Sequence, residues 1–186
     1  MVTLILVRHG QTDWNKEARI QGQSDIPLNE EGKRQAERIA RQLSRKKIAA
    51  IYTSKLKRAY QTAHAVARPH CLKVVKDERL NEIAQGDWEG LTLSEAREKY
   101  PVLFEKWLSV PLQTRPPGGE NLESVKRRVA EVLNEIIKRH PSQTVVIVAH
   151  EVVNAVIKSI CERIDLRNIW NLHFSNASYE VIKVEN

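Results

Sequence analysis

Short hydrophobic runs alternate along this chain with longer segments in which hydrophobic positions recur at helical spacing. The runs are typical of strands buried on both faces and cover residues 3–8, 48–53, 72–75, 144–150 and 178–184. Helices are expected in the segments between them, from Asn29 to about Leu43, over 55–67, from Thr92 towards Tyr100, over 121–139 and from about 151 to 161. This alternation predicts an α/β fold with a mostly parallel central sheet and helices on both faces.

Polar residues mark several of the helix ends. Asn29 is a favourable amino-terminal cap, and Thr92 with Glu95 forms the pattern of a capping box. Pro101 is expected to interrupt the helix that starts at Thr92, because the residue before a proline avoids helical backbone angles. The run Pro116–Gly119 predicts a rigid turn.

Two of the predicted strands lead directly into a histidine. The first strand is followed by Arg8 and His9, and the strand over 144–150 ends in His150. In open parallel sheets, ligands bind beyond the carboxyl ends of the strands. If the two strands are neighbours, His9 and His150 lie side by side in one crevice.

Several kinds of chemistry fit these histidines poorly. The segment HEVVN (150–154) resembles a zinc-binding helix, but Asn154 stands where the second histidine ligand is needed, and the two cysteines form no C-x-x-C pair. We therefore expect no metal and no cofactor. Neither a G-x-S-x-G turn nor a P-loop is present. Histidine itself remains as the nucleophile, with arginine to neutralise a phosphoryl group.

A series of motifs, in order along the chain, resembles the histidine phosphatase superfamily, which is also called phosphoglycerate mutase-like. The matching segments are LVRHGQTDWN (6–15), IQGQSDIPLNEEG (20–32), YTSKLKRAYQTA (52–63), LNEIAQGDWEG (80–90), PPGGENLESVKRRV (116–129) and VIVAH (146–150). The resemblance implies the phosphoglycerate mutase-like α/β fold and a phosphomonoesterase that acts through a phosphohistidine.

The resemblance also implies roles for individual residues. His9 corresponds to the phosphorylated nucleophile, and Glu82 to the group that protonates the leaving oxygen and then activates water. The implied phosphate pocket consists of Arg8, Arg58 and His150. The implied substrate-binding residues are Asn15, Gln21 and Gly22. Trp88 is expected to anchor the loop that carries Glu82.

The chain departs from parts of the family. The insertion of the cofactor-dependent mutases is absent between Glu89 and Pro116, so the chain resembles the compact phosphatase branch, with α-ribazole phosphatases and metal-independent phosphoserine phosphatases. Phosphoglycerate mutase activity is the alternative. Glu151 follows His150 where much of the family has glycine. This carboxylate either contacts a substrate hydroxyl or ammonium group, or has only a structural role.

Composition limits the remaining possibilities. The 186 residues fit one domain, 1–186, and no hydrophobic run reaches the roughly 18 residues of a membrane helix. No signal peptide is evident, so a cytoplasmic location is expected. The net charge of +7 raises the alternative of a catalytically silent, nucleic-acid-binding module, but the basic residues are interspersed with glutamates. The expected partner is a small phosphate ester rather than nucleic acid or membrane, and a homodimer stays an open option.

Overall fold

A computed structural model describes residues 1–185 and contains a five-stranded sheet. The strands are β1 (Val2–Arg8), β2 (Ala50–Thr53), β3 (Val74–Lys76), β4 (Thr144–Ala149) and β5 (Tyr179–Val184), in the order β3-β2-β4-β1-β5. β3, β2, β4 and β1 run parallel to one another, whereas β5 pairs with β1 in the antiparallel direction. The predicted mostly parallel sheet is confirmed.

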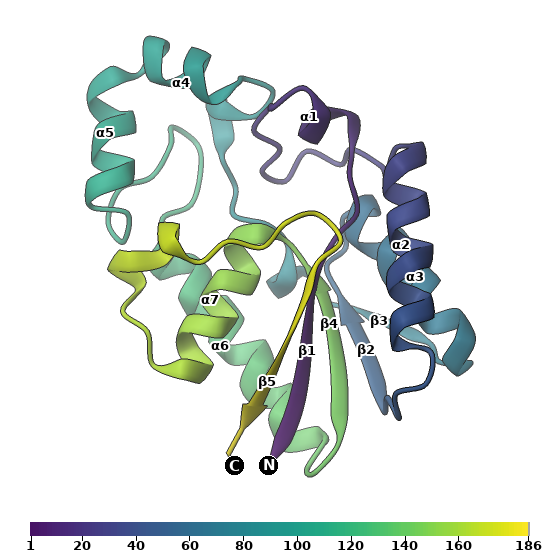
Figure 1. The fold of residues 1–186 in the computed structure, drawn as a ribbon. Coiled ribbons are helices and arrows are strands. Elements are labelled where there is room, and N and C mark those ends of the chain that lie inside the picture. The colour runs from purple at the N-terminus through teal and green to yellow at the C-terminus, as the bar shows by residue number, and fades with distance from the viewer. Residues whose placement is uncertain (186) are drawn as a thin grey trace.

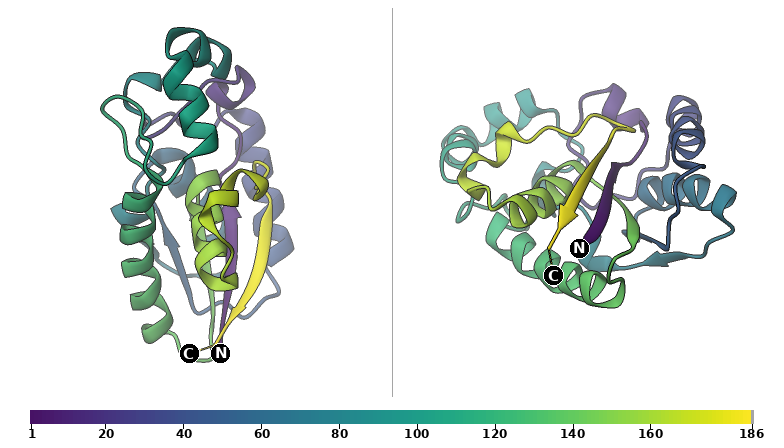
Figure 2. Two further views of the ribbon diagram at one scale, coloured as in Figure 1. Left: turned by 90° about the vertical axis from the view of Figure 1, so that its left-hand side faces the viewer. Right: turned by 60° about the horizontal axis from the view of Figure 1, so that its bottom comes forward.

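Helices cover both faces of this sheet (Figure 1). The helices are α1 (Asp13–Lys16), α2 (Glu30–Leu43), α3 (Lys57–Ala67), α4 (Leu93–Lys99), α5 (Pro101–Ser109), α6 (Leu122–Arg139) and α7 (Glu151–Glu162). Short 3₁₀ helices occupy Arg68–His70, Glu78–Leu80, Gly86–Trp88 and Leu166–Asn171. α2 and α3 pack on one face and α6 and α7 on the other, while α4 and α5 lie beyond the carboxyl ends of the parallel strands (Figure 2).

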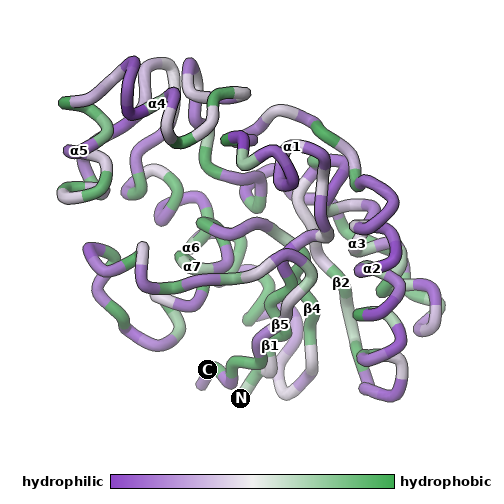
Figure 3. Tube along the Cα trace, turned by 45° about the horizontal axis from the view of Figure 1, so that its top comes forward, coloured by the Kyte–Doolittle hydropathy of each residue, from purple (hydrophilic) through white to green (hydrophobic). Residues whose placement is uncertain are grey.

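The alternation of side chains along β1 explains the two helical layers. Leu4 and Leu6 belong to the hydrophobic cluster formed with α6 and α7, whereas Ile5 and Val7 belong to the cluster formed with α2 and α3. All four side chains are buried, as a parallel strand covered on both faces requires. Figure 3 shows the hydrophobic colour along the central strands and a mixture of hydrophobic and hydrophilic positions along α2. The sheet is therefore a rigid platform for residues at its strand ends.

Several boundaries differ from the sequence-based expectation: β2 begins at Ala50 rather than at residue 48, and α3 begins at Lys57 rather than at residue 55. The third strand begins at Val74 rather than Leu72, because a 3₁₀ turn precedes it and Cys71 has a left-handed backbone with φ of 53°. Pro101 ends α4 as expected but also begins α5, since proline is well tolerated in the first turn of a helix. None of the helices within residues 1–185 has the length and hydrophobicity that crossing a bilayer requires.

Candidate active site

Three neighbouring strands end in polar side chains that lie close together. His9 follows β1, His150 follows β4, and Ser54 follows β2, in the part of the sheet where β2, β4 and β1 are adjacent. The rings of His9 and His150 have centroids 5.1 Å apart, and the Ser54 hydroxyl lies 2.8 Å from Nε2 of His150. All three residues are buried. The crevice expected from the two histidine-terminated strands is therefore present.

His9 is held as a neutral imidazole. Its Nδ1 lies 2.7 Å from the carbonyl oxygen of Gly10, which can only accept a hydrogen bond, so Nδ1 carries the proton and Nε2 keeps its lone pair. Burial lowers the pKa of His9 well below its ordinary value of 6.5, and the positive charges of Arg58 and Arg8 lower it further. An unprotonated Nε2 beside two guanidinium groups is suited to attack an electrophile that carries negative charge.

Arg58 supplies a buried positive charge to this crevice. It lies in the first turn of α3, and its guanidinium donates to the carbonyl oxygens of Ser24 and Gly22, both at 2.7 Å. Burial lowers its pKa to about 10, which leaves it charged at neutral pH. One turn later, the Thr62 hydroxyl accepts from the amide of Gly10 at 3.1 Å. α3 therefore fixes both Arg58 and the backbone next to His9.

Arg8 contacts the residue whose role the sequence left open. Its Nη1 lies 3.0 Å from Oε2 of Glu151 and also donates to the carbonyl oxygen of Phe174. Nδ1 of His173 lies 3.7 Å from Oε1 of the same glutamate. Glu151 keeps 39% of its side chain exposed, so its carboxylate is at once a partner of Arg8 and accessible at the rim.

Glu82 approaches the crevice from the segment between β3 and α4. One carboxyl oxygen accepts from the amide of Ile83 at 2.9 Å and the other from the amide of Val152, in the first turn of α7, at 3.3 Å. Burial raises the pKa of Glu82 above its ordinary value of 4.5, although the Ile83 amide and Arg58 partly oppose this shift. A carboxyl group with a raised pKa can hold a proton closer to neutral pH and donate it.

These groups share one cleft of about 280 Å³. Eight of the nine predicted site residues line it, namely Arg8, His9, Asn15, Gln21, Gly22, Arg58, Glu82 and Glu151. The ninth, His150, is fully buried beside His9. The Asn15 amide oxygen accepts from the Thr12 amide at 3.1 Å and from the Asn176 side chain at 3.2 Å, which fixes the side chain at the cleft wall. The nine site residues predicted from the sequence therefore lie at or directly beside one cleft.

Three further polar residues at this site were not predicted. Ser54, which contacts His150, stands directly after a strand, so the reasoning that identified the two histidines would also have identified it. Arg19 and Gln85 line the cleft from irregular segments, and no spacing in the sequence marks them. Arg19 is held by Glu17, at 2.7 Å, and by the carbonyl oxygen of Gly90, at 2.8 Å.

The loop that carries Glu82 is anchored by Trp88. This indole is 1% exposed and packs among Tyr100, Phe104 and Trp107, with ring centroids 5.5–6.2 Å apart. Such aromatic contacts add to the hydrophobic gain of burying so large a side chain. The expected anchoring role of Trp88 is confirmed.

Glu89, the next residue, joins this loop to the loop beneath Arg58. One carboxylate oxygen accepts from the amides of Gln23, at 2.9 Å, and Gln85, at 3.1 Å, while the other accepts from the Ser24 hydroxyl at 2.6 Å. Because Ser24 also provides a carbonyl oxygen to Arg58, Glu89 links the two sides of the cleft.

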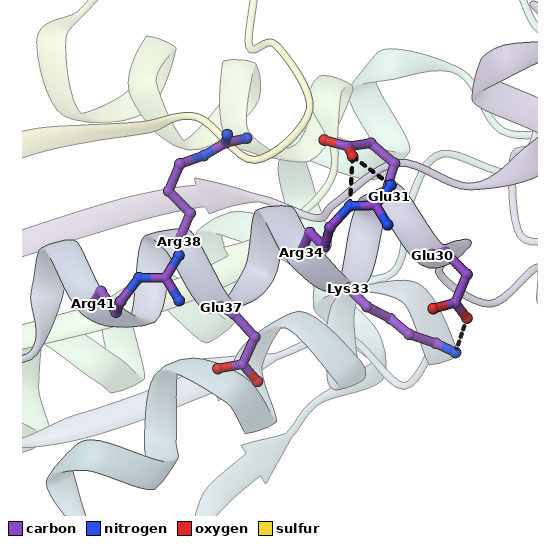
Figure 4. A pocket seen from close by; sticks show the side chains of 7 residues that line it. All are labelled: Glu30, Glu31, Lys33, Arg34, Glu37, Arg38 and Arg41. Atoms are coloured by element: carbon purple, nitrogen blue, oxygen red, sulfur yellow. Dashed lines mark hydrogen bonds and ion pairs between the residues drawn. The ribbon is translucent and has the colours of Figure 1, made fainter.

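A second hollow, on the outer face of α2, has a different character (Figure 4). Its lining consists of arginine and lysine side chains with glutamates among them. Two ion pairs, each between residues one helical turn apart, join Lys33 to Glu30 at 2.6 Å and Arg34 to Glu31 at 2.9 Å. Such pairs are typical of a solvated helix surface. Within residues 1–185, no group of three histidine, cysteine, aspartate or glutamate residues is arranged to hold a metal ion.

Comparison with known proteins agrees with this geometry. The model of the histidine phosphatase superfamily (branch 1) matches residues 4–186. Phosphoserine phosphatase 1 of Hydrogenobacter thermophilus is 44% identical over 185 residues, which span 100% of this chain and 88% of that protein. The solved structure of Bacillus stearothermophilus YhfR has a TM-score of 0.92 and 38% identity, with 100% of this chain and 92% of that chain covered. A mycobacterial glucosyl-3-phosphoglycerate phosphatase has a TM-score of 0.89 and 32% identity, with coverage of 96% and 90%. The chain therefore belongs to the histidine phosphatase superfamily, and it shares that family's hydrolysis of phosphomonoesters through a phosphohistidine.

Proposed function

We propose that Nε2 of His9 attacks the phosphorus of a small phosphate monoester and becomes phosphorylated. The observation that carries this proposal is the neutral, buried imidazole of His9 in the same cleft as the guanidinium groups of Arg8 and Arg58. A cation about 4 Å from a phosphoryl oxygen contributes roughly 4 kcal/mol at an effective dielectric constant of 20. The buried His150 and the NH₂ group of Asn15 provide further donors to the phosphoryl oxygens.

Glu82 is proposed as the proton donor of the first step and the base of the second. As the P–O bond breaks, its carboxyl group gives a proton to the leaving oxygen. The resulting carboxylate then takes a proton from the water that attacks phosphohistidine, which releases inorganic phosphate and regenerates both His9 and Glu82. Its raised pKa and its place at the cleft support this role.

The proposed substrate is a small ester with a hydroxyl or ammonium group near the phosphate, and phosphoserine is the first candidate. Two observations support this choice. The carboxylate of Glu151 is partly exposed at the rim, where it can accept from such a donor. The Hydrogenobacter thermophilus relative is named a phosphoserine phosphatase. In this proposal Gln21 and Gly22 line the rim, and residues 1–186 act as one domain without a metal ion or cofactor.

We further propose that the protein acts in the cytoplasm on small molecules and not on nucleic acid. The surface of α2 supports this view, because glutamates lie among its basic residues and form ion pairs with Lys33 and Arg34 (Figure 4). A homodimer is compatible with this proposal.

Rapid quenching with ³²P-labelled substrate tests the central step. An acid-labile, base-stable phosphoenzyme should accumulate in the wild type and in the control His64→Ala, whose histidine is exposed on α3, but not in His9→Ala. Labelling that persists in His9→Ala would overturn the assignment.

A substrate panel tests the reaction class. We expect hydrolysis of phosphoserine, ribose 5-phosphate esters or sugar phosphates in the presence of EDTA, and the ester with the highest kcat/KM identifies the substrate class. With 3-phosphoglycerate and a bisphosphoglycerate primer we expect inorganic phosphate. Efficient formation of 2-phosphoglycerate would instead favour the mutase alternative, and strict dependence on divalent ions would contradict a metal-independent reaction.

A further inference from the structure

Arg128, on α6, donates hydrogen bonds to the segment that carries Glu82 and to Glu120. Nη1 donates to the carbonyl oxygens of Arg79 and Asn81, both at 2.7 Å, and Nη2 donates to the carbonyl oxygen of Glu82 at 3.2 Å. Nε and Nη2 also donate to the two carboxylate oxygens of Glu120, both at 3.0 Å. All five N–H groups of the side chain are therefore engaged.

Glu120 continues the same network to the far end of the segment. Its Oε2 accepts from the amide of Ala84 at 2.9 Å, and its own amide donates to the carbonyl oxygen of Ala84 at 2.9 Å. The Arg128–Glu120 pair thus binds the backbone on both sides of Glu82. The side chains of Arg128 and Glu120 are only 17% and 24% exposed, so water competes weakly for these hydrogen bonds.

This arrangement is needed because Glu82 lies outside the sheet. Its segment contains two short 3₁₀ helices and no strand, so no ladder of backbone hydrogen bonds sets the position of its carboxyl group. A general acid must reach the leaving oxygen at hydrogen-bond distance, and a displacement of about 1 Å can reduce the rate about 10²-fold.

We propose that Arg128, paired with Glu120, is the positioning residue that places the Glu82 carboxyl group for proton transfer to the leaving oxygen. This inference rests on the proposed role of Glu82 as the acid. Arg128 itself does not line the cleft, so it acts through the backbone of residues 79–84 rather than by contact with substrate. The planar fork of arginine is required, because a lysine ammonium is a point charge with three donors and cannot serve five acceptor contacts.

The test compares two substrates in Arg128→Lys. We expect kcat/KM for an alkyl phosphate, whose leaving oxygen must be protonated, to fall about 10²-fold. The kcat/KM for p-nitrophenyl phosphate, whose leaving group hardly needs a proton, should change less than about threefold, because kcat/KM reports only the steps up to departure of the leaving group and excludes the later attack of water. Arg127→Lys is the matched control, since Arg127 is the exposed neighbour on the same helix, and it should leave both rates unchanged. Equal losses of kcat/KM on both substrates in Arg128→Lys would contradict the proposal.

A double-mutant cycle separates positioning from a general structural role. In the Glu82→Gln background no acid remains to be placed, so adding Arg128→Lys should produce little further loss on the alkyl phosphate. Independent, multiplicative losses would overturn the inference. Glu120→Gln provides a second route if Arg128→Lys folds poorly, and circular dichroism identifies the folded variants.

The same data distinguish this inference from the proposed function. If Glu82→Gln alone lowers kcat/KM equally for both substrates, Glu82 is not the acid and the proposed function fails at that step. If Glu82→Gln is selective for the alkyl phosphate but Arg128→Lys is not, only the positioning role is wrong.

Discussion

On one side of the cleft, His9 and His150 extend from backbone that is hydrogen-bonded into the sheet, whereas Glu82 on the other side extends from a segment between short 3₁₀ helices. The His9 amide donates to the carbonyl oxygen of Ala149 at 3.1 Å, directly after the parallel register of β1 and β4. The Glu82 segment is held instead by side chains, chiefly Arg128 and Glu89.

This difference separates two tasks. Every phosphate monoester presents the same phosphoryl group, and the sheet provides a rigid position for the groups that bind it. Leaving groups vary, and the residues near the leaving oxygen lie on segments where one side-chain substitution can move the backbone. Damage to the sheet side should therefore slow all substrates alike, whereas damage to the loop side should depend on the leaving group.

The largest selective effect is expected for Glu82→Gln. The kcat/KM for an alkyl phosphate should fall about 10²–10⁴-fold, the range of general acid catalysis, while kcat/KM for p-nitrophenyl phosphate should fall far less. In the wild type, kcat/KM for the alkyl phosphate should also decline as the pH rises through the raised pKa of Glu82 in the free enzyme, because the proton to be donated is then lost. Steady-state pH profiles of both proteins check this, and a decline that persists in Glu82→Gln would point to another acid.

Arg58→Ala tests the side of the cleft that binds the phosphoryl group. We expect a loss of about 10²–10³ in kcat on every substrate, by analogy with removal of one preorganised donor. The exposed Arg68, near the end of the same helix, gives the control Arg68→Ala, which should retain full activity. A loss confined to poor leaving groups would show that the division between the two sides is wrong.

Glu151 contacts Arg8 and also lines the cleft, so its substitution tests whether a residue next to the phosphate-binding groups can affect the choice of leaving group. Because the proposed substrate donates a hydrogen bond to Glu151, Glu151→Gly should raise KM for phosphoserine but not for p-nitrophenyl phosphate, which has no such donor. Identical changes in kcat/KM for phosphoserine, a ribose 5-phosphate ester and p-nitrophenyl phosphate would instead show that Glu151 acts only through Arg8. Glu151→Gln serves as the isosteric comparison.

The smallest effect concerns stability. His150 is buried with its pKa lowered well below 6.5, chiefly by burial, so protons bind the unfolded chain more tightly. The neutral His150 side chain contributes fully to the free energy of unfolding above pH 6.5, and this contribution is lost as the pH falls below that value. Between pH 7.5 and 5.5, the free energy of unfolding should fall by about 1 kcal/mol less in His150→Asn than in the wild type, measured by urea denaturation. Equal losses would show that His150 accepts a proton in the folded state.

The same division explains which parts of the molecule could be predicted from the sequence. His9 and His150 follow hydrophobic runs, and a parallel sheet necessarily brings such strand ends together. Glu82 lies in no periodic pattern, so only the family motifs identified it. Arg128 lies on the polar side of an amphipathic helix, where its sequence position is no different from that of a solvated arginine. Its partners are backbone carbonyl groups, which a pattern of side chains cannot reveal.

The hydrogen bond from Nδ1 of His9 to the Gly10 carbonyl oxygen also affects how long the proposed phosphoenzyme persists. With Nδ1 protonated, a phosphoryl group on Nε2 is bonded to an imidazolium, and attack by water releases neutral imidazole. Without that proton the departing group would be an imidazolate anion, which is far more basic and leaves far more slowly. A single backbone oxygen thus favours a short-lived covalent intermediate, which suits an enzyme that passes its phosphoryl group to water.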